Sequence, residues 1–188
     1  MNQDLKDQSD EELLLRSRDG NVAAFGVLVR RYESKVAATV IGMLGNCDEA
    51  DDVGQETFVR FYQALGAFRG DSGIGTYITR IAINLSLNEL RRRERRLLLF
   101  KKIEPGNDPE EPAAKETHDQ FEEREVVSRA LESLSPKFRA VVTLRLIEGY
   151  STEETAEILQ IPLGTVLSRL RRAQKKLQSM LHTYKEGF

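Results

Sequence analysis

The sequence contains no tryptophan, one cysteine and two histidines among its 188 residues. The single cysteine, Cys47, excludes an internal disulfide, which fits a protein of a reducing compartment. The most prominent apolar run, Leu97–Phe100, is far shorter than the roughly 20 residues of a membrane span. The first residues are acidic, where a signal peptide would be basic and then apolar. We therefore expect a soluble cytoplasmic protein.

Motifs of catalysis and metal binding are also missing from the sequence. His118 and His182 lie far apart, and Cys47 has no histidine near it. Metal sites need closely spaced His and Cys residues, and no phosphate-binding loop or nucleophile elbow occurs. The Gly-Asn-Cys-Asp segment around Cys47 indicates a turn rather than a nucleophile. We therefore predict no catalytic residue, no metal, no cofactor and no small-molecule substrate.

Charge is balanced in total but strongly segregated along the chain. The sequence has 28 basic and 30 acidic side chains, a formal net charge of −2. Residues 80–102 carry eight basic and two acidic side chains, and residues 165–185 carry six basic and no acidic ones. Between them, residues 104–125 carry nine acidic and two basic side chains. Two basic clusters of this kind are typical of nucleic-acid binding, although a solvated helix face is the simpler alternative for either one.

Almost the whole chain shows the three- and four-residue spacing of apolar side chains that predicts amphipathic helices. Ser9-x-x-Glu12 and Ser151-x-x-Glu154 match the capping box that begins a helix. Other expected caps and helix ends are Gly20, Gly45, Asp48, Thr76, Ser135 and Gly149. No alternating strand pattern and no internal repeat is found, so the sequence predicts an all-α fold.

Two segments interrupt the helical pattern. Residues 66–75 contain four glycines and are expected to form a loop. Residues 103–117 contain three prolines and few apolar side chains, too few to fold alone, so they indicate a linker. We therefore predict two small helical domains, residues 1–100 and 121–188, joined by a flexible acidic linker over residues 101–120.

The second domain contains a helix-turn-helix pattern in residues 151–177. A short helix with small Ala156 precedes the turn Ile161-Pro162-Leu163-Gly164, and Thr165 is the expected cap of the next helix. In this layout the second helix lies in the major groove of DNA. Its outward face carries Ser168, Arg171, Arg172 and Lys175, and arginine can read guanine with two hydrogen bonds. The alternative is a helical hairpin with a solvated basic face.

Several motifs in order resemble one known family over nearly the whole chain. They are Glu49-Ala50-Asp51-Asp52-Val53-Gly54-Gln55-Glu56-Thr57-Phe58, Phe68-Arg69-Gly70-Asp71-Ser72, Thr76-Tyr77-Ile78-Thr79-Arg80-Ile81-Ala82-Ile83-Asn84, Leu134-Ser135-Pro136, and Ile161-Pro162-Leu163-Gly164-Thr165-Val166 continuing to Arg172. The sequence thus resembles a bacterial sigma factor of the extracytoplasmic function (ECF) type. The resemblance implies sigma region two in residues 1–100, a linker, and a helix-turn-helix sigma region four in residues 121–188.

The resemblance also implies two partners and the residues that meet them. Core RNA polymerase would be bound through the clamp helices of its largest subunit, by Asp52, Gln55 and Glu56, and through the flap of its second-largest subunit. Without the resemblance, these acidic residues would simply suit a helix N-terminus. Promoter DNA is the second partner. The implied −10 residues are Arg60, Ala64, Phe68, Asn84, Arg91, Arg92, Arg93, Arg95 and Arg96, and the −35 residues are Thr165, Ser168, Arg169, Arg171, Arg172 and Lys175.

Each of these assignments has an alternative at single residues. Asn84 could be an ordinary amide on a helix surface, and Phe68 could belong to the core. The acidic linker would enter polymerase channels near the active centre, or else be an inert tether. The family is also commonly held by an anti-sigma factor, often at the inner face of the membrane.

The sequence departs from the family pattern at a few positions. Gly54 lies mid-helix where an apolar residue is usual, so it either weakens the docking helix or permits close approach. Leu167 replaces a usual Lys or Arg at the start of the recognition helix, and Thr155 replaces a usual Ile. Tyr62 and Tyr77 stand where tryptophan is common.

A free-standing helix-turn-helix regulator is the alternative function. Such proteins usually bind two half-sites as dimers, and no heptad seam for a dimer is found. Tight binding to duplex DNA without polymerase would distinguish this alternative from a sigma factor.

Overall fold

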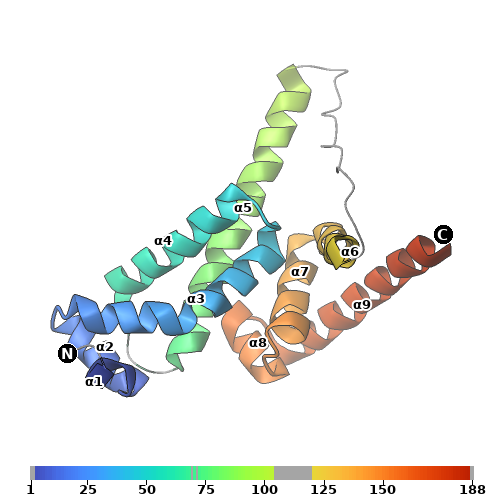
Figure 1. The fold of residues 1–188 in the computed structure, drawn as a ribbon. Helices are drawn as coiled ribbons and strands as arrows, with labels where there is room; N and C mark the ends of the chain where they lie inside the picture. Colours follow the sequence, from blue (N-terminus) through green and yellow to red (C-terminus); the bar gives the residue numbers. More distant parts are fainter. Residues whose placement is uncertain (1–2, 69, 71, 104–119, 187–188) are drawn as a thin grey trace.

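The computed structural model describes residues 3–68, 70, 72–103 and 120–186. Within these ranges the regular structure is entirely helical, which confirms the all-α prediction (Figure 1). The N-terminal part contains α1 (Gln3–Lys6), α2 (Asp10–Arg18), α3 (Val22–Leu44), α4 (Asp48–Ala64) and α5 (Ile74–Ile103). The C-terminal part contains α6 (Gln120–Glu132), α7 (Pro136–Val142), the π-helical turn η1 (Thr143–Ile147), α8 (Thr152–Leu159) and α9 (Leu163–Glu186).

Most helix ends lie where local sequence signals predicted them. Both capping boxes form, with Ser9 before α2 and Ser151 before α8. Gly45 ends α3 with a positive φ of 80°, a backbone conformation that favours glycine. Three expected caps are displaced: α4 begins at Asp48 itself after Cys47, α5 begins at Ile74 rather than after Thr76, and α9 begins at Leu163 rather than after Thr165.

The linker prediction is tested only at its edges. Helix α5 continues to Ile103, three residues into the predicted linker of residues 101–120, and α6 begins at its last residue, Gln120. The rest of that segment, residues 104–119, lies outside the described residues.

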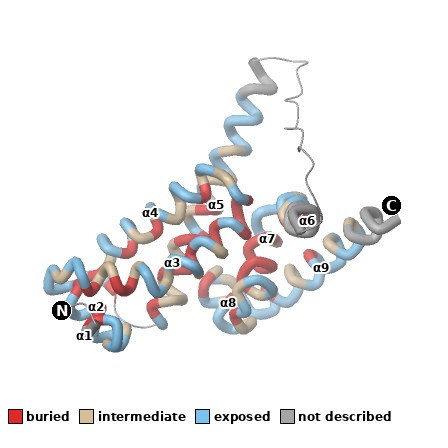
Figure 2. The backbone as a smooth tube through the Cα atoms, in the orientation of Figure 1, coloured by how far each residue is buried: buried red, intermediate tan, exposed pale blue. Residues whose placement is uncertain are grey.

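Helix α3 is the centre of the N-terminal domain. It packs against α2, α4 and α5, and its buried positions follow one side of the helix (Figure 2). Leu13, Leu28 and Phe61 are fully buried where these helices meet. Burying such side chains contributes about 2 kcal/mol each, so these contacts hold α2 and α4 firmly on α3.

The C-terminal domain has a small core of its own. Leu134, in the turn before α7, and Val142 of α7 pack against Ala173 of α9, together with Leu131 of α6. Helix α7 continues through η1 and ends before Gly149, whose φ is 72°. This core holds α9 against α7 and leaves the other side of α9 open to solvent.

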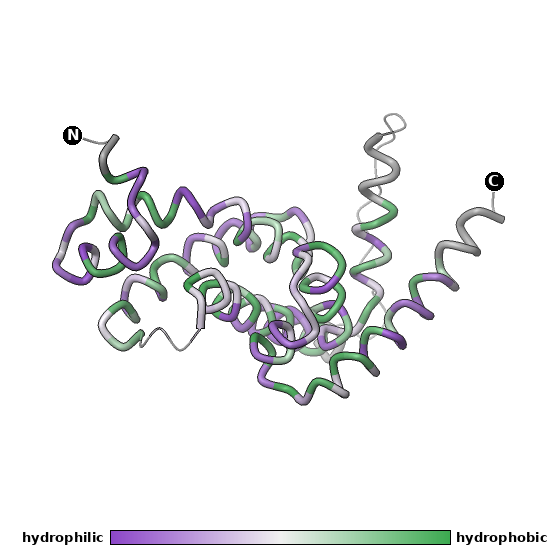
Figure 3. The backbone as a smooth tube through the Cα atoms, turned by 90° about the horizontal axis from the view of Figure 1, so that it is seen from below, coloured by the Kyte–Doolittle hydropathy of each residue, from purple (hydrophilic) through white to green (hydrophobic). Residues whose placement is uncertain are grey.

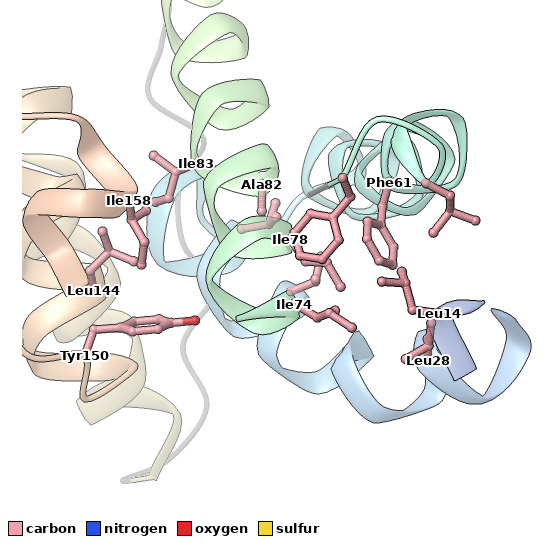
Figure 4. Packing of buried hydrophobic residues seen from close by; sticks show 14 of the residues in the cluster. Leu14, Leu28, Phe61, Ile74, Ile78, Ala82, Ile83, Leu144, Tyr150 and Ile158 are labelled. Carbon is pink, nitrogen blue, oxygen red and sulfur yellow. The ribbon is translucent and has the colours of Figure 1, made fainter. Parts of the chain in front are cut away.

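The two domains pack directly on each other, which the sequence did not predict. The larger hydrophobic cluster includes Phe61 and Ile83 of the N-terminal domain together with Leu144, Tyr150 and Ile158 of the C-terminal domain. Figure 4 shows Tyr150, Leu144 and Ile158 facing α5, on the side of Ile83. The apolar core is therefore continuous from one domain into the other.

Candidate nucleic-acid interface

The helix-turn-helix is built from a capped short helix and a tight turn. The Ser151 hydroxyl accepts a hydrogen bond from the Glu154 amide at 3.0 Å, and the Glu154 carboxylate accepts one from the Ser151 amide at 2.7 Å. These bonds, first of all the one from the backbone amide of Ser151, lower the pKa of Glu154. Helix α8 ends at Gln160, whose φ of 52° is left-handed and turns the chain towards α9.

Helix α9 begins earlier than its expected cap. Its first residue is Leu163, so Thr165 already lies inside the first turn, with its amide bonded to the Pro162 carbonyl at 2.8 Å. Val166 and Ala173 are fully buried, and together with Ile158 of α8 they fix the helix on the domain. These positions define the face of α9 that packs on the domain.

The outward face of α9 carries the cations predicted for DNA. Ser168, Arg171, Arg172 and Lys175 are exposed, while Thr165 and Arg169 are half-buried. Among the residues that the structure describes, none of these four cations forms an ion pair, so their charge is available to a partner. Figure 3 shows the alternation of hydrophilic and hydrophobic positions along α9, which runs to the end marked C. Leu167 is 49% exposed on the same helix and adds an apolar contact at its start.

On α4, residues assigned to different partners contact each other. Asp52 and Gln55 are exposed, as the docking prediction requires. Glu56 forms a 2.6 Å salt bridge with Arg60, one helical turn later. Exposed pairs of this kind stabilise by at most about 1 kcal/mol, so either side chain can leave the other to meet a partner.

The loop between α4 and α5 is anchored by residues that the sequence did not single out. Arg18 of α2 donates hydrogen bonds to the carbonyl of Leu65 at 2.8 Å and to the carbonyl of Phe68. Phe68 is only 7% exposed and packs on Tyr77, with ring centroids 4.8 Å apart. This is the core position that the sequence left open as the alternative. Beside it, Ala64 is half-buried and Asn84 of α5 is exposed.

The arginine cluster at the end of α5 divides into two groups. Arg93 donates to the Leu44 carbonyl at 3.1 Å and to Glu49 at 3.2 Å, and Arg96 lies 3.6 Å from the carboxylate of Glu49. These two arginines therefore fasten α5 to the corner between α3 and α4. Glu49 has a lowered pKa, caused first by its own backbone amide and then by Arg93.

The remaining arginines of the cluster point into solvent. Arg91, Arg92 and Arg95 are exposed. Arg92 makes a long contact of 3.6 Å with Glu89, and Arg91 and Arg95 form no ion pair within the described part of the chain. Their charge is the part of the cluster available for phosphates.

Neither a metal site nor a membrane-spanning helix is found among the described residues. No group of three or more His, Cys, Asp or Glu side chains is arranged to hold a metal ion there. In the same residues, no helix combines the length and apolarity needed to cross a membrane.

Comparison with known families assigns both domains. Residues 28–96 match the family model of sigma-70 region 2, and residues 124–177 match that of sigma-70 region 4. A chain with these two regions in this order is a sigma factor, the subunit that directs RNA polymerase to promoters.

The similar proteins narrow the class further. The RNA polymerase sigma-H factor of Pseudomonas aeruginosa is 35% identical over 187 residues, which cover 94% of this chain and 96% of that protein. The ECF RNA polymerase sigma-E factor of Escherichia coli K12 is 37% identical over 179 residues, covering 91% and 93%. The chain belongs to the ECF family of sigma factors, and it is an alternative sigma factor that directs promoter recognition.

Solved structures agree with this assignment. CnrH, in complex with the cytosolic domain of CnrY, matches with a TM-score of 0.69 and 27% identity, covering 94% of this chain and 99% of that one. The sigma factor RpoE of Bartonella quintana, in complex with the anti-sigma factor NepR, shares the fold with a TM-score of 0.66. It is 24% identical and covers 84% of this chain and 96% of that one.

Proposed function

We propose that the two domains read the two promoter elements, with α9 on the −35 element and the region around α5 on the −10 element. The observation that carries this proposal is the pair of exposed basic surfaces, one on α9 and one at the end of α5. Among the described residues, Arg91 and Arg95 on α5 and Arg171 and Arg172 on α9 form no ion pair. The domain boundaries that we propose are residues 1–100, 101–120 and 121–188.

In the −35 surface, α9 inserts its outward face into the major groove. Arg171 and Arg172 are exposed there without ion pairs, so they can donate to guanine or phosphate. Ser168 and Lys175 extend the same face, and Thr165 and Arg169 lie at its edge. Exposed Leu167 replaces a cation at the start of the helix, so base preference there rests on apolar contact.

In the −10 surface, Asn84 and Arg60 lie exposed on α5 and α4, and Ala64 lines the loop between those helices. Phe68 supports that loop from the core. Arg91, Arg92 and Arg95 hold the phosphates of the melted strand, while Arg93 and Arg96 keep the helix in position through Glu49 of α4. Capture of an unstacked base, with basic side chains along the backbone, is a usual way of binding single strands.

Core polymerase is bound through α4 and through the C-terminal domain. Asp52 and Gln55 are exposed, and Glu56 becomes available when its surface pair with Arg60 opens. We assign this face to the clamp helices of the largest subunit and the C-terminal domain to the flap of the second-largest subunit. An anti-sigma factor, held at the inner face of the membrane, is the proposed regulator of this chain in the cytoplasm. No covalent chemistry is assigned to the chain.

Run-off transcription with purified core polymerase tests these roles. The double variant Arg171→Ala, Arg172→Ala should lower the affinity of the sigma–core complex for promoter DNA, because two phosphate or base contacts are lost. The slope of log affinity against log salt concentration should become shallower by up to about two units. Binding of this variant to core should be unchanged. Arg16→Ala with Arg30→Ala removes two exposed charges from the other domain and serves as the matched control.

A second variant tests the polymerase face. Asp52→Lys should weaken binding to core. Glu33→Lys, an equal charge change at an exposed position of α3, should not. Equal core affinity for both variants would remove Asp52 from the docking surface. Loss of core binding in the double arginine variant would contradict the role assigned to α9.

A further inference from the structure

Helix α2 lies outside the region assigned to the family, yet it is connected to the loop between α4 and α5. The match to sigma-70 region 2 begins at residue 28, whereas α2 ends at Arg18. Its last residue, Arg18, binds the start of the loop, and its first residue, Asp10, is connected to the end of the loop through Tyr32. The described part of this loop follows Ala64, which we assign to the −10 element.

Arg18 holds two carbonyl groups at the start of the loop. Its Nε donates to the carbonyl of Leu65 at 2.8 Å, and its Nη2 donates to the carbonyl of Phe68. The last carbonyls of a helix have no partner within the helix, and the helix dipole makes this end negative, so a cation is a favourable donor there. Because the N–H groups of a guanidinium lie in one rigid plane, a single arginine that binds both carbonyls also fixes their separation.

The backbone that Arg18 binds is a tight turn that begins at Ala64. The Ala64 carbonyl accepts hydrogen bonds from the amides of Ala67 and Phe68, each at 3.0 Å. The side chains of Leu65 and Phe68 are 4% and 7% exposed, so they are anchored in the core. The turn is therefore held from two sides, by the core through its side chains and by Arg18 through its carbonyls.

The other end of the loop rests on Tyr32 of α3. A Cβ added at Gly75, in the first turn of α5, would lie 3.0 Å from the Tyr32 ring, so the ring lies directly against this backbone. The Tyr32 hydroxyl donates to the carboxylate of Asp10, which also accepts a hydrogen bond from Arg31 at 2.6 Å. Burial first, and then the bond to Asp10, raise the pKa of Tyr32, so its hydroxyl remains a donor at neutral pH. Asp10 thus fixes the ring against which α5 begins.

Helix α2 is itself firmly placed between these two anchors. Leu13 and Leu14 are buried, and both belong to the main hydrophobic cluster. Figure 4 shows Leu14 close to Leu28 of α3 and Phe61 of α4. At 1.5 Å per residue, the nine residues of α2 span about 13 Å. The helix can therefore act as a fixed support that joins the two ends of the loop.

We propose that α2 is a positioning element for reading the −10 element, in which Arg18, and Asp10 through Tyr32, hold the loop between α4 and α5 in the shape that distinguishes the correct base. The inference rests on the assignment of Ala64 and Phe68 to the −10 element. A protein surface rejects a wrong base only if it cannot adapt to it, and a displacement of about 1 Å is enough to lose much of such selectivity. Arg18 and Asp10 act on the protein backbone and need no contact with DNA.

Base discrimination in run-off transcription tests this role. The templates are a promoter that the unmodified sigma–core complex transcribes, and derivatives with each single base substitution in its −10 and −35 elements. The readout is the ratio of transcript from the original promoter to transcript from each derivative. Arg18→Ala should lower the −10 ratios about threefold to tenfold, because one mismatched base usually costs about tenfold in binding. The −35 ratios should be unchanged. Arg16→Ala, which removes an exposed arginine from the same helix, is the matched control and should change neither set.

Two further variants separate positioning from stability. Val40→Ala creates a small cavity at a fully buried position of α3, two turns from Tyr32, and should lower stability while leaving the −10 ratios unchanged. Arg18→Lys keeps the charge but not the planar pair of donors, so it should restore only part of the discrimination lost in Arg18→Ala. If Val40→Ala lowers the −10 ratios as much as Arg18→Ala does, discrimination follows stability alone and the proposal fails.

The second anchor has its own test in the same assay. Asp10→Ala should lower the −10 ratios in the same direction as Arg18→Ala, whereas Asp7→Ala, an equal charge change at an exposed position, should not. Unchanged ratios for Asp10→Ala alone would overturn the role of the second anchor.

Two results for Arg18→Ala would overturn the proposal as a whole. One is a set of unchanged −10 ratios. The other is an equal loss of transcription from every template, which is the result expected for a lost phosphate contact. If −10 substitutions do not affect transcription by the unmodified protein, the assignment of the −10 surface fails instead.

Discussion

At the scale of single residues, Gly54 departs from the family pattern, and the structure shows its surroundings. It lies inside α4, and a Cβ added there would meet no atom within 4 Å. Of the two interpretations that the sequence left open, close approach within the chain therefore does not apply. The remaining effect inside the free protein is the cost of glycine in a helix interior, about 1 kcal/mol relative to alanine.

Gly54→Ala is accordingly expected to raise the free energy of unfolding by about 1 kcal/mol, measured by urea denaturation. Gly75→Ala is the matched comparison, because its Cβ would lie 3.0 Å from the Tyr32 ring and should bring no such gain. Core affinity of the Gly54→Ala variant should be retained. A strong loss of affinity without loss of stability would show that polymerase itself approaches this glycine closely.

Long-range partners are what the sequence could not supply at this scale. Arg93 was predicted as a phosphate ligand, yet it reaches Leu44 and Glu49, which are more than 40 positions away. Arg139 and Arg18 were not singled out, because their partners are backbone carbonyls of other helices. Thr155, expected to weaken the core, is fully buried with its hydroxyl unpaired. Such contacts depend on the tertiary fold and leave no local pattern.

At the scale of helices, local sequence signals predicted helix ends best where the stabilising hydrogen bonds join neighbouring residues. Both capping boxes were predicted, because their hydrogen bonds join residues three positions apart. The start of α9 was displaced to Leu163, and the π-helical turn after α7 was not foreseen. Leu144 of this turn belongs to the cluster shared with the other domain, a long-range contact that local periodicity does not report.

The capping box of α8 makes this helix pH-dependent. The pKa of Glu154 is lowered by its bonds to Ser151, so the box stabilises above the ordinary glutamate pKa and is lost as pH falls through the lowered value. Glu154→Gln should lower the melting temperature at pH 7 and match the unmodified protein near pH 2, where both side chains are neutral. Glu153→Gln, on the same exposed turn, is the control. An equal decrease at both pH values would exclude a role of the charge.

At the scale of the whole molecule, the continuous cluster links the stability of the two domains. Because Ile83 and Ile158 are buried in one core, the domains should unfold together in a single calorimetric transition. Arg80 of α5 forms a 3.0 Å salt bridge with Glu157 of α8. Opening the interface by Arg80→Glu should separate this into two transitions, the C-terminal domain melting first because its own cluster is small. Two transitions in the unmodified protein would show that the shared cluster does not couple the domains.

The class of the protein was predictable from sequence, whereas the arrangement of its domains was not. Ordered motifs and the helix-turn-helix pattern are local, so they identified a sigma factor and predicted α9 to within a few residues of its start. The packing of Tyr150 on Thr79 joins residues 71 positions apart, and neither side chain is unusual where it stands. Only the fold brings them together.

Gly42 of α3 packs so closely on Thr143 that it limits how this chain can be redesigned. Helix α3 would be improved, taken alone, by alanine at this position, and a calculation of helix propensity would recommend the exchange. The added methyl group would collide with Thr143 of the other domain. Gly42→Ala, which favours the isolated helix, would thus push the two domains apart at this contact. Engineering of this sigma factor therefore has to treat both domains as a single unit.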